Sequence, residues 1–232
     1  MNPVYVALDT TDLNQARQLA AQLRGCVGGL KLGLEFFNAR GPDGIKPFVE
    51  TGLPVFLDLK YHDIPNTVAG ACRAAAGLGV SILNVHAQGG AAMMRAGLDA
   101  AKSVSPATRV IAVTMLTSLG DEDLPSLGIQ PPVADQVLRL ATLARQCGLD
   151  GVVCSAHEIV RLRKELGPDF LLVVPGIRPA GAALGDQRRV MGPAQARDAG
   201  ASILVIGRPI TGAPDPALAA RDIAQSLGIS AG

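Results

Sequence analysis

Short apolar runs rich in leucine and β-branched residues alternate with longer, alanine-rich amphipathic segments along the whole chain. The apolar runs have the length of buried strands, and the segments after them have the apolar spacing of helices. We predict strands over residues 4–8, 29–32, 55–59, 82–86, 110–114, 151–154, 171–174 and 203–206. We predict helices over residues 13–23, 34–50, 67–78, 91–103, 133–146, 156–166, 193–199 and 216–227.

Eight strand–helix pairs therefore follow one another, with no linker and no change in composition between them. Eight such units in about 250 residues are typical of a (β/α)8 TIM barrel. We predict an α/β protein with one TIM-barrel domain over residues 1–232. A doubly wound open sheet is the alternative, because strands counted from a sequence are easily miscounted.

The segments between these elements carry turn and cap residues. Asp12 and Asp215 are expected to cap helix N-termini, and Gly148 and Gly200 to end helices. Two connections are longer than a barrel requires, residues 118–132 and 175–192. The second is rich in Gly, Pro and Arg, so we predict that it is a mobile lid.

Composition narrows the class of protein. The chain has 232 residues, of which 48% are hydrophobic, enough for a substantial core. A formal net charge of +1, 3% aromatic residues and no Trp argue against a nucleic-acid-binding surface. No apolar run reaches membrane-spanning length and no export signal precedes the first strand, so we expect a cytoplasmic protein without a membrane partner. The cysteines have no C-x-x-C spacing and are expected to be buried free thiols.

Charged and polar residues recur where the predicted strands end. Barrel enzymes build their active sites at the carboxyl ends of the strands, so these side chains are expected to converge on one rim. They are Asp9, Lys31, Asp58, Lys60, His86, Thr117, Arg178, Gly207 and Arg208.

The segment from Asp58 to Asp63 is the strongest chemical signal among them. Asp58 and Lys60 alternate on a strand and so share a face, and Asp63 follows beyond the strand end. Such charges are costly to desolvate unless they pair. The chain has sixteen arginines but five lysines, and Lys31 and Lys60 occupy strand ends where a transferable proton would be useful. The plainer alternatives are a strand-end ion pair with a helix-capping aspartate, and lysines that extend to solvent.

The last predicted strand leads into Gly207, Arg208 and Pro209. Backbone N–H groups and a guanidinium at this place in a barrel favour phosphate binding. A solvated arginine on the rim is the alternative.

Other catalytic patterns are missing from the sequence. It contains no nucleotide-binding glycine motif, no G-x-S-x-G and no H-E-x-x-H. The spacing of His62, His86 and His157 predicts no metal site, and His86 is expected to be packed and hydrogen-bonded.

These residues together resemble the orotidine 5′-phosphate decarboxylase family. Residues 58–67 read D-L-K-Y-H-D-I-P-N-T and contain the complete family pattern D-x-K-x-x-D-I-P-N-T. Further matching segments, in order along the chain, are Asp9 with its preceding Ala-Leu, 31–33, 113–118, 175–179, 185–189 and 206–210.

The resemblance implies decarboxylation of orotidine 5′-monophosphate to uridine 5′-monophosphate, the last step of de novo pyrimidine nucleotide synthesis, without a metal or organic cofactor. It implies that Lys60 donates a proton to C6 of the pyrimidine, and that Asp58 lies against the departing carboxylate. Lys31 and Asp63 would complete the charge network. The remaining substrate contacts that it implies are Asp9, Lys31 and Thr67 at the ribose, Thr117 at the pyrimidine, Gln187, Gly207, Arg208 and Arg178 at or near the phosphate, and Ile64 beside Asp63.

Two other functions remain open at this point. Related barrels that act on sugar phosphates share D-x-K-x-x-D but use Mg²⁺, and their chemistry requires a carboxylate where this chain has Lys31. A barrel that binds a phosphorylated ligand without turnover is the second.

Asp63 and Thr67 lie past the strand end, poorly placed to reach Lys60 of their own barrel. A two-fold homodimer would let each loop enter the neighbouring pocket. The family resemblance also implies active sites shared in this way.

Overall fold

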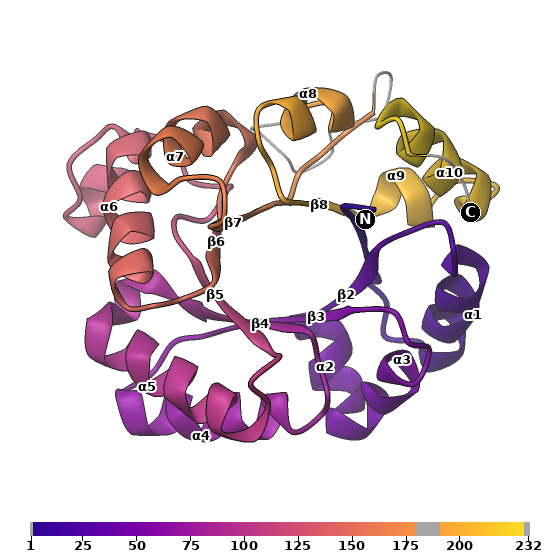
Figure 1. Ribbon diagram of the computed structural model, residues 1–232, viewed down its shortest axis with the longest axis horizontal. Helices are drawn as coiled ribbons and strands as arrows, with labels where there is room; N and C mark the ends of the chain where they lie inside the picture. Colours follow the sequence, from indigo (N-terminus) through magenta and orange to yellow (C-terminus); the bar gives the residue numbers. More distant parts are fainter. Residues whose placement is uncertain (1, 180–190, 230–232) are drawn as a thin grey trace.

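The computed structural model describes residues 2–179 and 191–229, and in these residues eight parallel strands close into one barrel. Each strand pairs with its sequence neighbour, and β1 pairs with β8. Figure 1 looks through the barrel, with the helices forming a ring outside it. The predicted TIM barrel is therefore confirmed, and the open-sheet alternative is excluded. The strands are β1 Val4–Ala7, β2 Gly29–Gly33, β3 Val55–Tyr61, β4 Ile82–His86, β5 Arg109–Val113, β6 Gly151–Val153, β7 Leu171–Val174 and β8 Ile203–Ile206.

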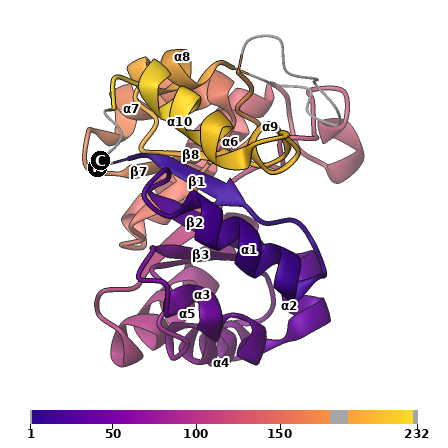
Figure 2. The same ribbon diagram turned by 90° about the vertical axis from the view of Figure 1, so that its right-hand side faces the viewer.

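Helices connect successive strands around the outside, as the side view in Figure 2 shows. They are α1 Leu13–Leu23, α2 Leu34–Arg40, α3 Lys46–Val49, α4 Pro65–Ala76, α5 Gly90–Val104, α6 Val133–Gln146, α7 Ile159–Leu166, α8 Pro193–Asp198, α9 Arg208–Thr211 and α10 Pro216–Ser226. Short 3₁₀ turns are η1 Pro42–Gly44, η2 Ala87–Gly89, η3 Leu124–Leu127 and η4 Ala156–Glu158. No helix in the described ranges is both long enough and apolar enough to span a membrane.

The prediction of one helix over residues 34–50 was wrong. The chain leaves α2 at Gly41, whose φ of 63° is left-handed, and Pro42 then begins η1. Gly41 adopts this angle without the clash that a side chain would cause, and a proline interrupts helical hydrogen bonding. The predicted caps are confirmed: the Asp12 and Asp215 side chains accept N–H bonds from α1 and α10.

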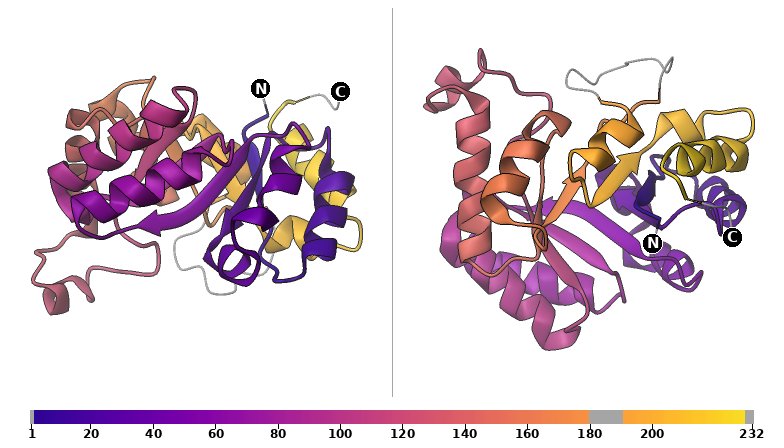
Figure 3. Two further views of the ribbon diagram at one scale, coloured as in Figure 1. Left: turned by 90° about the horizontal axis from the view of Figure 1, so that it is seen from below. Right: turned by 45° about the horizontal axis from the view of Figure 1, so that its top comes forward.

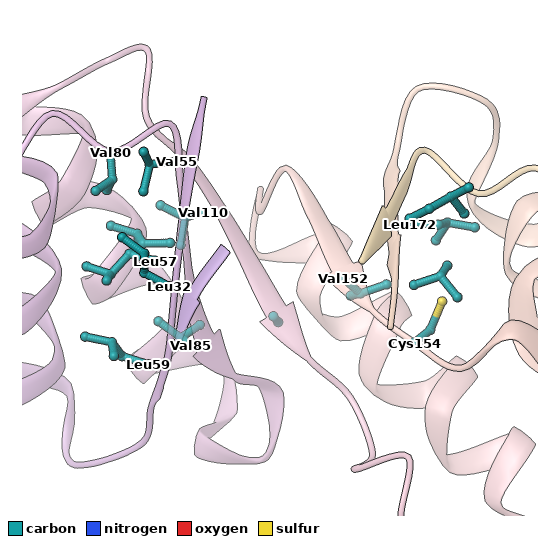
Figure 4. Packing of buried hydrophobic residues seen from close by; sticks show 14 of the residues in the cluster. Leu32, Val55, Leu57, Leu59, Val80, Val85, Val110, Val152, Cys154 and Leu172 are labelled. Atoms are coloured by element: carbon teal, nitrogen blue, oxygen red, sulfur yellow. The ribbon is translucent and has the colours of Figure 1, made fainter. Parts of the chain in front are cut away.

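Two apolar layers hold the barrel together. The larger lies between strands and helices, where Leu32, Leu57, Leu59 and Val85 point away from the barrel interior (Figure 4). Cys72, Cys147 and Cys154 are buried thiols, Cys26 is half-buried, and all four are free, as predicted. The second layer fills the barrel itself with Tyr5, Ala7, Phe56, Ile82, Ile111, Val173, Ile203 and Val205. This inner layer forms an apolar floor beneath the carboxyl ends of the strands.

The loop between β5 and α6 is one of the two predicted long connections. It contains η3 and projects beyond the helical ring in both views of Figure 3. Within this loop, the Asp121 carboxylate accepts the N–H of Val133, the first residue of α6, at 2.7 Å. Residues 180–190 of the predicted lid lie outside the described residues.

Replacing glycine by alanine should change the free energy of unfolding in opposite directions at a crowded position and at an open one. A Cβ on Gly151 in β6 would lie 2.3 Å from the Leu171 carbonyl oxygen, whereas one on exposed Gly70 in α4 meets nothing within 4 Å. Gly151→Ala should lower the free energy of unfolding by about 1–3 kcal/mol, because the neighbouring strand must move. Gly70→Ala should raise it by about 0.5–1 kcal/mol. Urea denaturation followed by circular dichroism measures both, and equal effects would contradict the close approach of β6 to β7.

Candidate active site

A pocket of about 260 Å³ opens at the carboxyl ends of the strands. Phe56, Val153, Val173 and Val205 form its apolar base, and polar residues from the strand ends and following loops surround it. The polar and loop residues are Asp9, Lys31, Asp58, Lys60, Thr117, Pro175, Gly176, Arg178, Gly207 and Arg208. The expected convergence on one rim is therefore confirmed for all of the strand-end residues except His86.

Asp58 lies at the centre of a charge network inside this pocket. Its Oδ1 is 2.7 Å from Lys60 Nζ, and its Oδ2 is 3.7 Å from Lys31 Nζ. Lys31 Nζ also donates to Asp9 Oδ1 at 3.1 Å. The Asp58 and Lys31 side chains are mostly buried, and the Lys60 side chain is 32% exposed but ion-paired with Asp58, so neither lysine simply extends into solvent. The network thus alternates Asp9, Lys31, Asp58 and Lys60.

The protonation of Asp58 is set by competing effects. Burial acts to raise its pKa, because a charged carboxylate is costly to desolvate. The charges of Lys31 and Lys60, with hydrogen bonds from Lys60 and Asn84, outweigh burial and hold the pKa below its usual value. Asp58 is therefore ionised at neutral pH.

The strand β3, which carries Asp58 and Lys60, is irregular at these two residues. Between the paired positions Leu57↔Leu83 and Tyr61↔Val85, three residues of β3 face one residue of β4. Lys60 has a φ of 51°, and among the described residues no other non-glycine residue has a positive φ. This left-handed conformation costs about 1–2 kcal/mol for a residue with a Cβ. The predicted proximity to Asp58 is confirmed, but a bulge rather than simple alternation produces it.

Arginines line the other end of the pocket. Arg178 follows β7 and is almost fully buried, and Arg208 begins α9 directly after Gly207. Burial lowers the pKa of Arg178, and the neighbouring charge of Arg208 lowers it further. Arg178 Nε is buried and has no hydrogen-bond partner within the described part of the chain. Four basic and two acidic side chains line the pocket, leaving two positive charges in excess to attract an anion.

Several predicted site residues lie elsewhere. Asp63, Ile64 and Thr67 are exposed and do not line the pocket of their own barrel. Asp63 Oδ1 accepts the Ile64 N–H at 2.6 Å, but Ile64, not Asp63, occupies the N-cap position of α4. Asp63 therefore does not cap α4 in the way that the plainer interpretation required. Gln187 lies outside the described residues.

His86 stacks on His62, with ring centroids 5.1 Å apart and ring planes 14° apart. Burial, His62 and Lys60 lower the pKa of His86 to about 4, so its ring is neutral at physiological pH. Its Nδ1 accepts the Gln88 N–H at 3.4 Å. The prediction of a packed, hydrogen-bonded histidine is confirmed.

Sequence reasoning missed Asn84, which contacts both Asp58 and Lys60 from β4. The available signal was a polar amide in the middle of an otherwise apolar strand. It also missed Gly33, where a Cβ would lie 3.0 Å from Lys31 Nζ. Across the described ranges, no cluster of three or more His, Cys, Asp or Glu side chains is arranged to hold a metal ion.

Comparisons with known proteins find relatives over nearly the whole chain. Orotidine 5′-phosphate decarboxylase of Rhodospirillum rubrum is 57% identical to this chain, over 97% of it and 94% of the relative. The same-named protein of Paramagnetospirillum magneticum is 53% identical, over 99% of this chain and all of the relative. The crystal structure of orotidine 5′-phosphate decarboxylase from Lactobacillus acidophilus has a TM-score of 0.87 at 39% identity, over 98% of this chain and 99% of that one.

A family model described as "Orotidine 5'-phosphate decarboxylase / HUMPS family" matches residues 2–223, nearly the whole chain. The match includes the strand ends that carry the pocket residues and the segment from Asp58 to Thr67. On the matched family model and on these identities, the chain belongs to the orotidine 5′-phosphate decarboxylase / HUMPS family.

Proposed function

We propose that this protein acts in the cytoplasm as a single-domain carboxy-lyase that converts orotidine 5′-monophosphate into uridine 5′-monophosphate and CO₂, completing pyrimidine nucleotide synthesis. One observation carries the proposal: the Lys31–Asp58–Lys60 network lies at one end of a pocket whose other end carries Arg178 and Arg208. The names of the curated relatives support the same activity.

The two ends of the pocket have separate tasks in this proposal. Arg208, Arg178 and the Gly207 backbone bind the phosphate, since guanidinium groups pair strongly with phosphate oxygens. Gln187 joins them. Asp9 and Lys31 bind the ribose, and Thr117 binds the pyrimidine edge above the apolar base. Binding energy from the phosphate then holds the pyrimidine against Asp58 and Lys60.

The reaction breaks the bond between C6 and the carboxylate carbon. The bonding electrons remain on C6 as CO₂ departs, and a proton from the Lys60 ammonium forms the new C6–H bond. The adjacent positive charge stabilises the developing carbanion, and it does so strongly in a buried site. Ionised Asp58 faces the substrate carboxylate and repels it more before the reaction than in the transition state, where that charge has dispersed into CO₂.

The amino-acid sequence alone left a second, Mg²⁺-dependent chemistry open. Mg²⁺-dependent relatives that act on sugar phosphates require an oxygen ligand near this position, and an ammonium cannot ligate Mg²⁺. In this chain Lys31 occupies the place and pairs with Asp9 and Asp58. A barrel that only binds a ligand has no need for a partly exposed lysine paired with a buried aspartate, such as Lys60 with Asp58. The decarboxylase is therefore the better supported function.

The active enzyme in this proposal is a homodimer with shared sites. Asp63 and Thr67 are exposed outside their own pocket, next to Ile64, which is apolar and 68% exposed. A two-fold axis near this segment would bury Ile64 and bring Asp63 beside Lys60 of the partner subunit. There Asp63 would complete the charge network, with Thr67 and Ile64 contacting the substrate.

The function predicts turnover that needs no metal and depends on Lys60. In excess EDTA the wild-type protein should still consume orotidine 5′-monophosphate, which is measured as the loss of the orotate absorbance. Lys60→Ala should lower kcat by at least ~10⁴-fold, because it removes both the proton and the charge facing C6. It should still bind the product nucleotide. Lys46→Ala, at an exposed lysine on α3, is the control. Loss of wild-type turnover in EDTA, or a Lys60→Ala variant with a tenth of wild-type kcat, would contradict the proposal.

The phosphate assignment predicts a substrate-dependent effect of Arg208. Arg208→Ala should lose about 2–5 kcal/mol of transition-state stabilisation in kcat/KM for the nucleotide, the range for breaking a charged hydrogen-bonded pair. The nucleoside without its phosphate should react at nearly equal rates with variant and wild type. Arg139→Ala, on the exposed side of α6, is the control. An equal slowing of nucleoside and nucleotide would show that Arg208 is structural instead.

Shared sites predict complementation between two weak variants. Lys60→Ala and Asp63→Asn are dissociated, mixed in equal amounts and reassociated. About half of the dimers should then be mixed, each with one intact and one doubly altered site, so about a quarter of wild-type activity should return. The assay is the same loss of orotate absorbance. If subunit exchange is demonstrated and no activity returns, Asp63 acts within its own chain.

A further inference from the structure

Asn84 is a polar side chain with no exposed surface, in the middle of β4 between Leu83 and Val85. Burying an amide is costly unless its donor and acceptor are both hydrogen-bonded. Both ends of this carboxamide are used, and both contacts are made to the charge network. A buried amide that served packing alone would have no reason to contact these two residues.

Three contacts of 2.7 Å link Asn84, Asp58 and Lys60, and Asn84 makes two of them. Its Oδ1 accepts the backbone N–H of Lys60 at 2.7 Å, and its Nδ2 donates to Asp58 Oδ1 at 2.7 Å. The same Asp58 oxygen accepts from Lys60 Nζ at 2.7 Å. An N–H can only donate and an ionised carboxylate can only accept, so only one orientation of the amide satisfies both partners.

The bulge in β3 explains why the amide is needed. Asn84 is the one residue of β4 that faces Asp58, Leu59 and Lys60, so the regular ladder is interrupted there. The Lys60 N–H receives its acceptor from the Asn84 side chain instead. That bond also holds Lys60 at a φ of 51°, which an isolated lysine disfavours.

We propose that Asn84 is a positioning residue for the decarboxylation: its carboxamide fixes the Lys60 ammonium and the Asp58 carboxylate relative to each other and to the substrate. This role rests on the proposed function. Asn84 acts through Lys60 and Asp58. A displacement of about 1 Å in such a pair can cost about 10²-fold in rate.

Two substitutions separate the two ends of the amide. Asn84→Ala removes both contacts. Asn84→Asp keeps the shape and an acceptor for the Lys60 N–H, but it places a second carboxylate against Asp58. If Asn84 served only to satisfy the bulge in β3, Asn84→Asp would preserve activity. In the positioning role, both variants should lower kcat by about 10²-fold or more.

The matched control is Thr108→Ala. Thr108 is equally buried and its hydroxyl donates to the Val80 carbonyl oxygen, but it precedes β5 at the opposite end of the barrel. Its loss should lower the melting temperature and leave kcat unchanged per folded molecule. The Asn84 variants should instead lower kcat while the dissociation constant of uridine 5′-monophosphate, bound largely through its phosphate, changes by less than about threefold.

The pH profile supplies a second readout. Asp58 is faced by Lys31 from β2, Lys60 from its own strand, Asn84 from β4 and, through Lys31, Asp9 after β1. Activity that requires ionised Asp58 is lost as pH falls through its pKa. A carboxylate at position 84 would raise that pKa, so Asn84→Asp should lose activity at a higher pH than wild type does.

Each outcome bears on a defined claim. If folded Asn84→Ala or Asn84→Asp keeps kcat within about threefold of wild type, or if the acid side of the Asn84→Asp profile does not move, the positioning role is wrong. Asn84→Asp is nearly isosteric, so it keeps the test available should Asn84→Ala fail to fold. A wild-type protein that does not consume orotidine 5′-monophosphate would instead overturn the proposed function, and this role with it.

Discussion

The site depends on the ion pairs that the buried Asp58 carboxylate makes with Lys31 and Lys60. A carboxylate inside a barrel is tolerated only if positive charge and hydrogen bonds replace the water it has lost. Lys31, Lys60 and Asn84 supply these from the strand before, the same strand and the strand after. Only parallel strands that lie side by side in sequence order bring the three groups together. The order of the strands therefore fixes the network, and removing Lys31, Lys60 or Asn84 leaves the buried Asp58 carboxylate with one partner fewer.

The apolar inner layer makes this network effective. Phe56, Val153, Val173 and Val205 fill the barrel below the charges, so the groups act in surroundings of low polarisability on one side. Arg178 and Arg208 line the same pocket from the ends of β7 and β8, whereas Lys31, Asp58 and Lys60 lie on β2 and β3. A ligand that is anionic at one end and uncharged and flat in the middle fits this division. In the proposed function, these two parts of the pocket anchor the substrate and carry the reaction.

The sequence predicted the barrel and the residues that meet at its rim, because both follow from short-range patterns. Apolar periodicity located all eight strands, and the position relative to a strand end placed every predicted rim residue except His86 in the pocket. Two features depended on contacts between strands and were out of reach, and one local break was missed. The bulge in β3 gives Lys60 a positive φ, which strand alternation alone does not predict. Asn84 gains its significance only from the strand beside it. The break at Gly41 is local, and the Gly41-Pro42 pair was the available signal for it.

The irregularity in β3 also restricts how this segment can vary in length. Its three residues opposite Asn84 exceed the regular pairing by two, an even number, so Leu57 and Tyr61 both still face the helices. Inserting or deleting a single residue here would reverse inside and outside for everything that follows in the strand. The geometry of the Asp-x-Lys pair therefore belongs to two adjacent strands together, with the extra pair of residues on one and an amide on the other.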